Sequence, residues 1–350
     1  MQGLPRERKL AAGSNSSVAR RHAASPPKCM DALWAEAFYG CAFDGCTPWT
    51  KLASMPAATI HIPVLLEEVL EGLRAAPGGV FVDGTLGGGG HTRALAERVR
   101  PNGRVVAVDL DPGAVERTSE TLRGLPIDVA AASYVAIPEV LAELGIEAVD
   151  GILLDLGLSS DQLADTDRGF SFDAPGELDL RFDATDGEPA WRLLERLREQ
   201  DLADVIYKYG EERFSRRIAR KIVERRQQEP IRTAAELAAL VRSCVPRGKG
   251  HQIDPATRTF QALRIAVNDE LGNVERALAS LPNCLKPGGR LAVISFHSLE
   301  DRIVKQAFRE DPRLTVVTRK PVLASDAEIA VNPRARSAKL RIAERVGPGP

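Results

Sequence analysis

Residues 80–91 read VFVDGTLGGGGH, and this stretch decides the fold. A β-branched and aromatic run ends at an acid, passes through four consecutive glycines and continues into helix-forming residues. The pattern predicts a strand, a turn and the start of a helix. Glycines let the backbone approach a ligand closely, and the free N–H groups of a helix N-terminus favour polar or anionic ligands. The stretch therefore indicates a nucleotide-type site in an α/β sheet.

A second apolar strand ends in an acid about twenty residues after the turn, where residues 105–109 read VVAVD. A carboxylate at this place, Asp109, can accept hydrogen bonds from both hydroxyls of a ribose. Together the turn and the acid predict a cofactor that carries a nucleoside.

Dinucleotides and methyl donors share this layout, so the class of cofactor needs a separate argument. A dinucleotide fingerprint needs a third glycine in register, and Gly90 is followed by His91 and Thr92 instead. Asp83, at the tip of the first strand, would repel a diphosphate but suits the ammonium group of S-adenosylmethionine. The residues therefore favour S-adenosylmethionine, with NAD and a glycine turn without any ligand as the alternatives.

A further strand of the buried type ends at Asp155, where residues 148–160 read AVDGILLDLGLSS. Ligands of open parallel sheets bind beyond the carboxyl ends of the strands. We therefore expect Asp155, Ser159 and Ser160 to border the same crevice as Gly89 and Asp109.

These motifs and several others carry a resemblance to a known family. The chain is similar to the bacterial-type small-subunit ribosomal RNA cytosine-N4 methyltransferases, the MraW or RsmH family, from about His61 to Arg345 and in the family's order. The segments that carry it are HIPVLL at 61–66, DGTLGGGGH at 83–91, DLGLSS at 155–160, RGFSF at 168–172, YGEERF at 209–214, PATRTFQALR at 255–264, SFHSLEDR at 295–302 and NPRARS at 332–337.

The resemblance implies a fold, a reaction and a set of site residues. The implied fold is α/β: the Rossmann-like class I S-adenosylmethionine-dependent methyltransferase fold with an inserted helical domain. The implied reaction is N4-methylation of a cytidine in small-subunit (16S-type) ribosomal RNA, with ribosomal RNA or the small subunit as partner. The residues implied to contact the donor are Gly89, Gly90, His91, Asp109, Tyr134, Asp155 and Gln162, where Tyr134 stands at a position that is often Phe in the family.

The residues themselves favour an amine as the methyl acceptor. The exocyclic amine of cytosine is a weak nucleophile that must be oriented and must lose a proton, which Asp155, Ser159 and Ser160 are placed to accept. Methylation of a ring carbon would need a cysteine nucleophile, and neither Cys244 nor Cys284 is expected at the carboxyl end of a strand. The alternative for Asp155 is a helix N-cap without a chemical role.

The domain organisation follows from the spacing of the strands, expected near 79–84, 104–109, 127–132, 149–155, 289–296, 314–319 and 338–344. The long gap after the fourth strand is charged and helix-forming, which exceeds an ordinary connection. We therefore expect a methyltransferase domain at 55–160 and 255–350, an inserted helical substrate-recognition domain at 161–254, and one long helix at 256–281 with an apolar seam. Residues 1–54 are expected to be a disordered, dispensable extension, or else a transit peptide.

Charge is distributed unevenly, although the formal net charge is only -1. Basic residues crowd one predicted helix, and Arg216, Arg217 and Arg220 are the predicted RNA contacts, with a solvated helix face as the alternative. Arg247, Lys249 and His251 form a second basic cluster. Aromatic residues that could stack on an extruded base are Phe170, Phe172 and Phe296, with core packing as the alternative; for His91 and His297 the alternative to a role in the site is simple hydrogen bonding.

Composition adds bounds to these predictions. The five cysteines have no Cys-x-x-Cys pair and no zinc spacing, which favours reduced thiols and no metal site. No apolar run is long enough to span a membrane, so a soluble protein is expected. The reduced thiols favour a cytoplasmic protein, or an organellar one if residues 1–54 are a transit peptide. The oligomeric state stays open, a homodimer included. A non-catalytic RNA-binding or ribosome assembly factor on the same scaffold is the alternative function.

Overall fold

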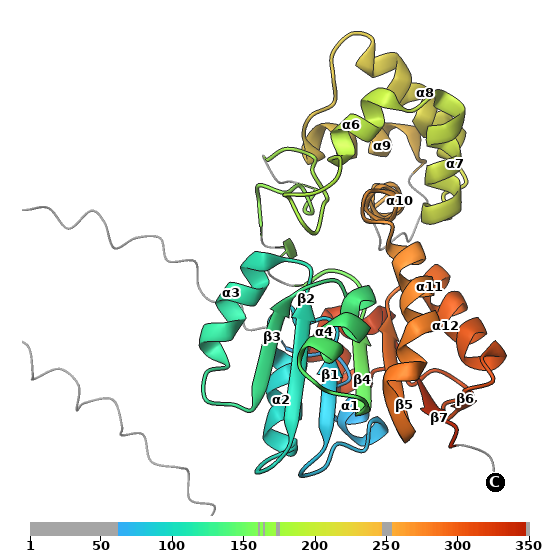
Figure 1. The fold of residues 1–350 in the computed structure, drawn as a ribbon. Helices are drawn as coiled ribbons and strands as arrows, with labels where there is room; N and C mark the ends of the chain where they lie inside the picture. The colour runs from blue at the N-terminus through green and yellow to red at the C-terminus, as the bar shows by residue number, and fades with distance from the viewer. Residues whose placement is uncertain (1–61, 160–161, 164, 173–175, 247–253, 348–350) are drawn as a thin grey trace, which may run out of the picture. The chain divides into compact units, whose positions relative to one another are not determined.

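A single sheet organises the computed structural model, which describes residues 62–159, 162–163, 165–172, 176–246 and 254–347. Its seven strands lie in the order β3-β2-β1-β4-β5-β7-β6 (Figure 1). Every predicted strand is present, although β5 begins earlier and β6 is shorter than expected. The strands are β1 (Val80–Asp83), β2 (Arg104–Asp109), β3 (Ile127–Ala131), β4 (Val149–Asp155), β5 (Leu285–Ser295), β6 (Leu314–Val316) and β7 (Lys339–Arg345).

The strand pairing places the site. The strands from β3 to β5 pair in parallel, whereas β7 runs antiparallel to both β5 and β6. The strand order reverses at β1, because β2 lies on one side of it and β4 on the other. Crossover connections leave in opposite directions from such a point, which opens a crevice beyond the carboxyl ends of the strands. Asp83, Asp109 and Asp155 are the last residues of β1, β2 and β4.

Alternating side chains give the sheet two buried faces, as the strand period of two requires. On one face Val82 packs with α4 (Ile137–Glu143), α11 (Glu270–Ser280) and α12 (Ser298–Glu310). On the other face Phe81 packs with α1 (Leu66–Gly72) and α2 (Gly90–Arg98). This two-sided packing explains why the strands read as continuous apolar runs.

The long stretch between β4 and β5 is helical. It contains α6 (Ala190–Arg196), α7 (Glu199–Gly210), α8 (Ser215–Arg226) and α9 (Ala234–Cys244), which lie apart from the sheet (Figure 1). These helices bury a separate core that includes Ile218 and Ile222, both fully buried. A capping box formed by Thr233 and Glu236 begins α9. Among the described residues, no helix is both long and apolar enough to cross a membrane.

The predicted helix at 256–281 is wrong as a single helix. It is two helices, α10 (Thr257–Asn268) and α11, because Asp269 between them is left-handed with φ 46° and ψ 42°. A left-handed residue cannot continue a right-handed helix. The apolar seam continues through the break because its halves serve different cores: Phe260 and Leu263 pack with the helical segment, and Val274 and Leu278 pack on the sheet. We therefore propose that the inserted domain continues through α10 and ends near Asn268.

Candidate active site

A single cavity at the carboxyl edge of the sheet collects most of the predicted site residues. Gly89 is not part of its lining, and Ser160 lies outside the described residues, as do Arg247, Lys249, His251 and the extension at 1–54. The predicted donor and catalytic residues that do line the cavity are Gly90, His91, Asp109, Tyr134, Asp155, Ser159 and Gln162.

The glycine turn is tied directly to the acid at the end of β2. The N–H of Gly87 donates to Asp109 Oδ2 at 2.7 Å, and Gly87 has a φ of 47° that favours glycine. Gly89, with a φ of 77°, is the N-cap of α2, and a Cβ there would lie 2.8 Å from Thr118 Cγ2. Gly89 is therefore required by backbone geometry and packing, which explains why it faces α3 (Pro112–Thr121) rather than the cavity.

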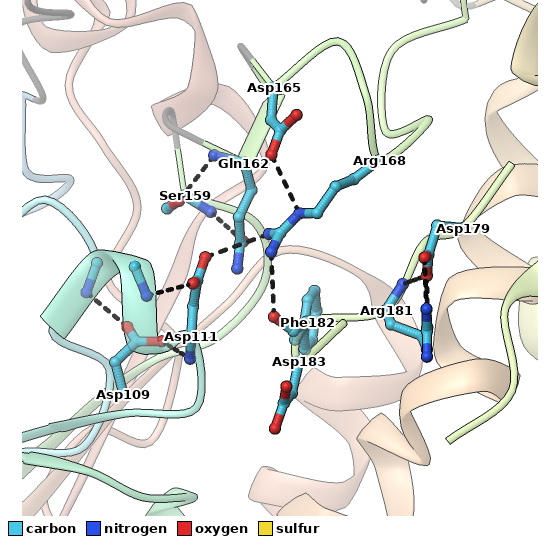
Figure 2. Close-up of polar contacts among 12 residues, drawn as sticks. Asp109, Asp111, Ser159, Gln162, Asp165, Arg168, Asp179, Arg181, Phe182 and Asp183 are labelled. Atoms are coloured by element: carbon cyan, nitrogen blue, oxygen red, sulfur yellow. Dashed lines mark hydrogen bonds and ion pairs between the residues drawn. The ribbon is translucent and has the colours of Figure 1, made fainter. Parts of the chain in front are cut away.

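Asp109 is held in place from two sides and still faces the cavity. Its Oδ1 accepts the N–H of Asp111 at 2.9 Å, while Oδ2 accepts that of Gly87 (Figure 2). Burial raises the pKa of its carboxyl above the usual range, and the two backbone hydrogen bonds oppose this rise. Each carboxylate oxygen has a second lone pair. Asp109 is therefore held in a fixed position with acceptor capacity left for a ligand in the cavity.

Asp83 does not have the role that its position suggested. Its side chain is only 1% exposed and does not line the cavity. Oδ1 accepts from the N–H and the hydroxyl of Thr85, and Oδ2 accepts from Thr92 Oγ1 at 2.6 Å. Asp83 thus fastens the end of β1 to the first turn of α2, and its inferred contact with the donor's ammonium was wrong.

Asp155 lines the cavity at the end of β4 and has one carboxylate oxygen without a hydrogen-bond partner. Its backbone N–H donates to Thr85 Oγ1 at 2.7 Å, which fixes the end of β4 against the turn after β1. Its Oδ1 is buried without a hydrogen-bond partner, and no side-chain cap to a helix N–H is found in the described part of the chain. Burial raises the pKa of its carboxyl to about 6, although His91 and Arg334 oppose the rise.

His91 lies beside Asp155 but makes no hydrogen bond to its carboxylate. Its Nε2 lies 2.9 Å from the carbonyl oxygen of Val64, and since a carbonyl only accepts, Nε2 carries a proton. Its Nδ1 lies 3.6 Å from Asp155 Oδ2, which is beyond a normal hydrogen bond. Both oxygens of Asp155 therefore retain lone pairs for a ligand.

Ser159 and Gln162 bond to each other. The N–H of Ser159 donates to Gln162 Oε1 at 3.0 Å, and the N–H of Gln162 donates to Ser159 Oγ at 3.1 Å (Figure 2). The Ser159 hydroxyl accepts one hydrogen bond, so its proton and its second lone pair are left for a ligand. This pair orients the loop after β4 along the cavity.

Of the three aromatic residues predicted to stack on a base, one lines the cavity and two pack in the helical core. Phe296 lines the cavity, and its ring lies 3.4 Å from where a Cβ at Gly157 would stand, so the glycine lets the ring approach the loop after Asp155. Phe170 and Phe172 instead pack in the helical core, where Phe172 meets the ring of Phe260 edge-on at 4.8 Å. Sequence reasoning missed Phe182, which lines the cavity but follows no strand and no recognisable motif.

A buried network of charged residues includes Glu270 and Glu300, which line the cavity. Arg264 makes two hydrogen bonds to Glu270, at 2.7 and 2.9 Å, and Glu300 Oε1 lies 3.1 Å from His297 Nε2. Burial acts to raise the pKa of Glu300, but hydrogen bonds from His297 and Phe296 hold it below the usual range. A carboxylate oxygen of Glu270, one of Glu300 and a ring nitrogen of His297 lie within 4.8 Å of one another, close enough to bind one metal ion together. Arg264 already supplies the counter-charge there, so the donor set favours a structural network.

The predicted RNA-binding arginines lie away from the cavity, on the exposed face of α8. Arg216, Arg217 and Arg220 are all exposed, whereas Ile218 and Ile222 on the other face are buried. Arg220 lies 3.4 Å from Glu199. Arg226 differs because it donates to the carbonyl oxygens of Leu194 and Leu197 and joins two helices.

The strand order and the acids at the strand ends define an S-adenosylmethionine-dependent methyltransferase of the Rossmann-like class. The residues present fit this cofactor: Asp109 is set for the ribose, Tyr134 gives an aromatic surface, and Asp155 Oδ1 is a buried acceptor without a partner. The chain belongs to the MraW methylase family, whose model matches residues 58–346. The predicted family, fold class and cofactor are thereby confirmed.

Two relatives match this chain in sequence along almost their whole length. A protein named ribosomal RNA small subunit methyltransferase H from Rhodopirellula baltica is 51% identical over 308 residues, covering 85% of this chain and 95% of its own. The protein of the same name from Geobacter sulfurreducens is 48% identical, covering 82% of this chain and 99% of its own. A solved structure described as a putative rRNA methylase from Clostridium thermocellum has a TM-score of 0.41 at 14% identity, over 81% of this chain and 99% of that one.

Proposed function

We propose that this protein transfers one methyl group from S-adenosylmethionine to the N4 amine of a cytidine in small-subunit ribosomal RNA. The class of substrate rests on the relatives, which are named as ribosomal RNA small subunit methyltransferases. The observation that supports an amine acceptor is Asp155, with an unpartnered buried oxygen and a pKa raised to about 6 in the cavity wall.

Asp155 suits the requirements of an amine because the amine must lose a proton as it is methylated. A carboxylate with a pKa near 6 is mostly ionised at neutral pH and is a stronger base than an ordinary Asp. The bound cofactor supplies a methyl group activated on a sulfonium. The chain's part is to hold the cytosine amine in line with that group, to accept its proton at Asp155 and to exclude water.

The surroundings of Asp155 favour a flat, polar acceptor such as a base. Phe296 lies beside the loop after Asp155, and Phe182 lines the same cavity from the segment before α6. We propose that one of these rings stacks on an extruded cytosine, as enzymes that modify bases commonly require. Phe170 and Phe172 are not part of this proposal because both belong to the helical core.

The exposed face of α8 is the proposed contact with RNA phosphates. Arg216 and Arg217 are both exposed, and neither pairs with an acidic side chain within the described residues. Dense cationic charge on one helix face supplies phosphate affinity without reading sequence. The target is therefore expected to be selected by RNA shape and by the fit of the base in the cavity.

The decisive experiment is methyl transfer to small subunits that lack the modification, followed by mass spectrometry of digested RNA. We expect N4-methylcytidine that depends on added S-adenosylmethionine. A methyl group on C5 or on a 2′-oxygen would contradict the amine mechanism. RNA binding without any methylated nucleoside would support the non-catalytic assembly factor instead.

A further inference from the structure

Arg168 joins three parts of the chain that the proposed reaction needs together. It lies between β4 and α6, and its side chain is only 16% exposed. Its Nη2 lies 3.2 Å from Asp111 Oδ2, its Nη1 donates to the carbonyl oxygen of Phe182 at 3.3 Å, and its Nε lies 3.3 Å from Asp165 Oδ2 (Figure 2). A planar guanidinium can hold several acceptors in one fixed geometry, which a lysine cannot do.

On one side Arg168 contacts Asp111, two residues after the end of β2. Asp111 is the N-cap of α3, where its Oδ1 accepts the N–H of Gly113 at 2.9 Å. The N–H of Asp111 donates in turn to Asp109, the proposed ribose acceptor. Arg168 does not line the cavity itself. It is linked to Asp109 in the cavity wall through one residue, Asp111.

On the other side Arg168 fixes an aromatic wall of the cavity. The backbone of Phe182 is held at both of its polar atoms, since its C=O accepts from Arg168 and its N–H donates to Asn268 Oδ1 at 2.8 Å. Asn268 ends α10 and also donates to the carbonyl oxygen of Leu180 at 2.8 Å. Phe182 therefore has a position set by the helical segment and by Arg168 together.

We propose that Arg168 is a positioning residue that couples binding of the methyl donor at Asp109 to the placement of Phe182 against the accepting base. The coupling rests on the proposed function for the identity of that base. Asp109 already has its position, so a donor bound there acts by reducing the remaining motion of the backbone from Asp109 to Asp111. This steadies the contact of Asp111 with Arg168 and, through Arg168, the backbone of Phe182. The same contact makes donor affinity depend on the inserted segment, because such coupling is reciprocal.

A second contact between the helical segment and the sheet domain provides the control. Glu211, after α7, accepts from Ser298 Oγ at 2.5 Å and lies 3.4 Å from Arg302 Nη2, both on α12. This contact is exposed and touches neither Asp109 nor Phe182. A variant of Glu211 therefore weakens the contact with α12 and leaves the contacts of Arg168 with Asp111 and Phe182 unchanged.

The test compares Arg168→Gln and Asp111→Asn with Glu211→Gln, each checked for folding by its melting temperature. Asn replaces Asp at a helix N-cap with little cost, so Asp111→Asn keeps α3 while removing the charge that Arg168 meets. Amide hydrogen exchange of residues 177–183 is measured with and without S-adenosylhomocysteine, and the affinity for S-adenosylhomocysteine is measured by calorimetry. Neither measurement uses RNA, so the proposal can fail or hold independently of the reaction assigned above.

We expect S-adenosylhomocysteine to slow exchange at residues 177–183 in the wild type and in Glu211→Gln, but not in Arg168→Gln or Asp111→Asn. The two latter variants are expected to bind S-adenosylhomocysteine about tenfold more weakly, and the double variant no more weakly than the worse single one, as for two residues of one coupled pair. In turnover, Arg168→Gln is expected to lower kcat more than it raises KM for RNA. Ligand-dependent protection that survives in Arg168→Gln, or that is lost equally in Glu211→Gln, would overturn the proposal.

Discussion

The cavity at the sheet edge and the exposed face of α8 use charge in opposite ways. In the cavity, Asp109 is fixed by two backbone N–H groups before any ligand arrives. On α8, Arg216 and Arg217 extend from the surface, and no acidic partner is recorded for them in the part of the chain that the structure describes. A preorganised site gains specificity because its groups need no rearrangement on binding. A flexible cationic face gains affinity for many phosphate geometries.

The difference also predicts which changes each region tolerates. Burial perturbs the acids of the cavity, as the raised pKa of Asp155 shows, so a single substitution there alters the chemistry. The arginines of α8 act through summed charge, so each contributes a modest share. The predictions below separate these two behaviours, from the largest expected effect to the smallest.

Replacing Asp155 is expected to have the largest effect of all. Asp155→Ala removes the proposed proton acceptor, and a general base contributes roughly 10²–10⁴-fold to a rate. We expect kcat to fall by about that range in a radiolabelled transfer assay, while RNA affinity measured by filter binding changes by less than about threefold, since the α8 face is intact. A parallel loss of RNA affinity and turnover would instead give Asp155 a role in binding or folding.

Replacing Asp109 tests the preorganised side of the comparison. Asp109→Ala removes a charge-assisted contact worth about 1.5–3 kcal/mol, which corresponds to a donor affinity about tenfold to 150-fold lower. Calorimetry with S-adenosylhomocysteine measures this directly. Asp128→Ala is a suitable control, because Asp128 lies on β3 beside β2 and pairs with Arg104 at the surface. Unchanged affinity in Asp109→Ala would remove this residue from the site.

Changing Arg216, Arg217 and Arg220 together to Glu tests the other side. RNA binding is expected to weaken, and the negative slope of log affinity against log salt to lose about 2 in magnitude, since each single-strand phosphate contact contributes about −0.7 to it. Donor affinity is expected to stay the same. Arg319→Glu with Lys320→Glu provides a control of two exposed cations in the segment after β6. Equal RNA affinity in the wild type and the triple variant across a salt series would make α8 an ordinary solvated helix.

The sequence predicted the parts of the site that depend on strand ends. Asp109, Asp155 and the glycine turn lie where parallel strands must end, so their meeting in one cavity follows from topology. The buried stripe of α8 follows from helix periodicity, and the capping box of α9 follows from a Thr-x-x-Glu motif. These features depend on local pattern and on one rule about sheets, and both can be read along a chain.

The features that the sequence missed depend on contacts between distant residues. Asp83 has the same motif position whether its carboxylate faces a ligand or bonds to Thr92, and only packing decides this. The break at Asp269 coincides with tertiary hydrogen bonds of Asn268 rather than with proline or glycine. Phe182 joins the cavity because the segment before α6 folds back over it, which no periodicity records.

The smallest expected effect is a pH dependence that separates the two regions. The pKa of Asp155 is about 6, and its carboxyl must be ionised to accept a proton, so the rate is expected to level off above pH 7 and to fall about tenfold per unit below pH 6. Initial rates with both substrates well below saturation report this pKa for the free enzyme. RNA affinity is expected to stay constant from pH 5 to 8, because guanidinium groups do not titrate there. An RNA affinity that fell together with the rate would show that the two regions share a titrating group, and a flat rate down to pH 5 would show that Asp155 does not accept the proton.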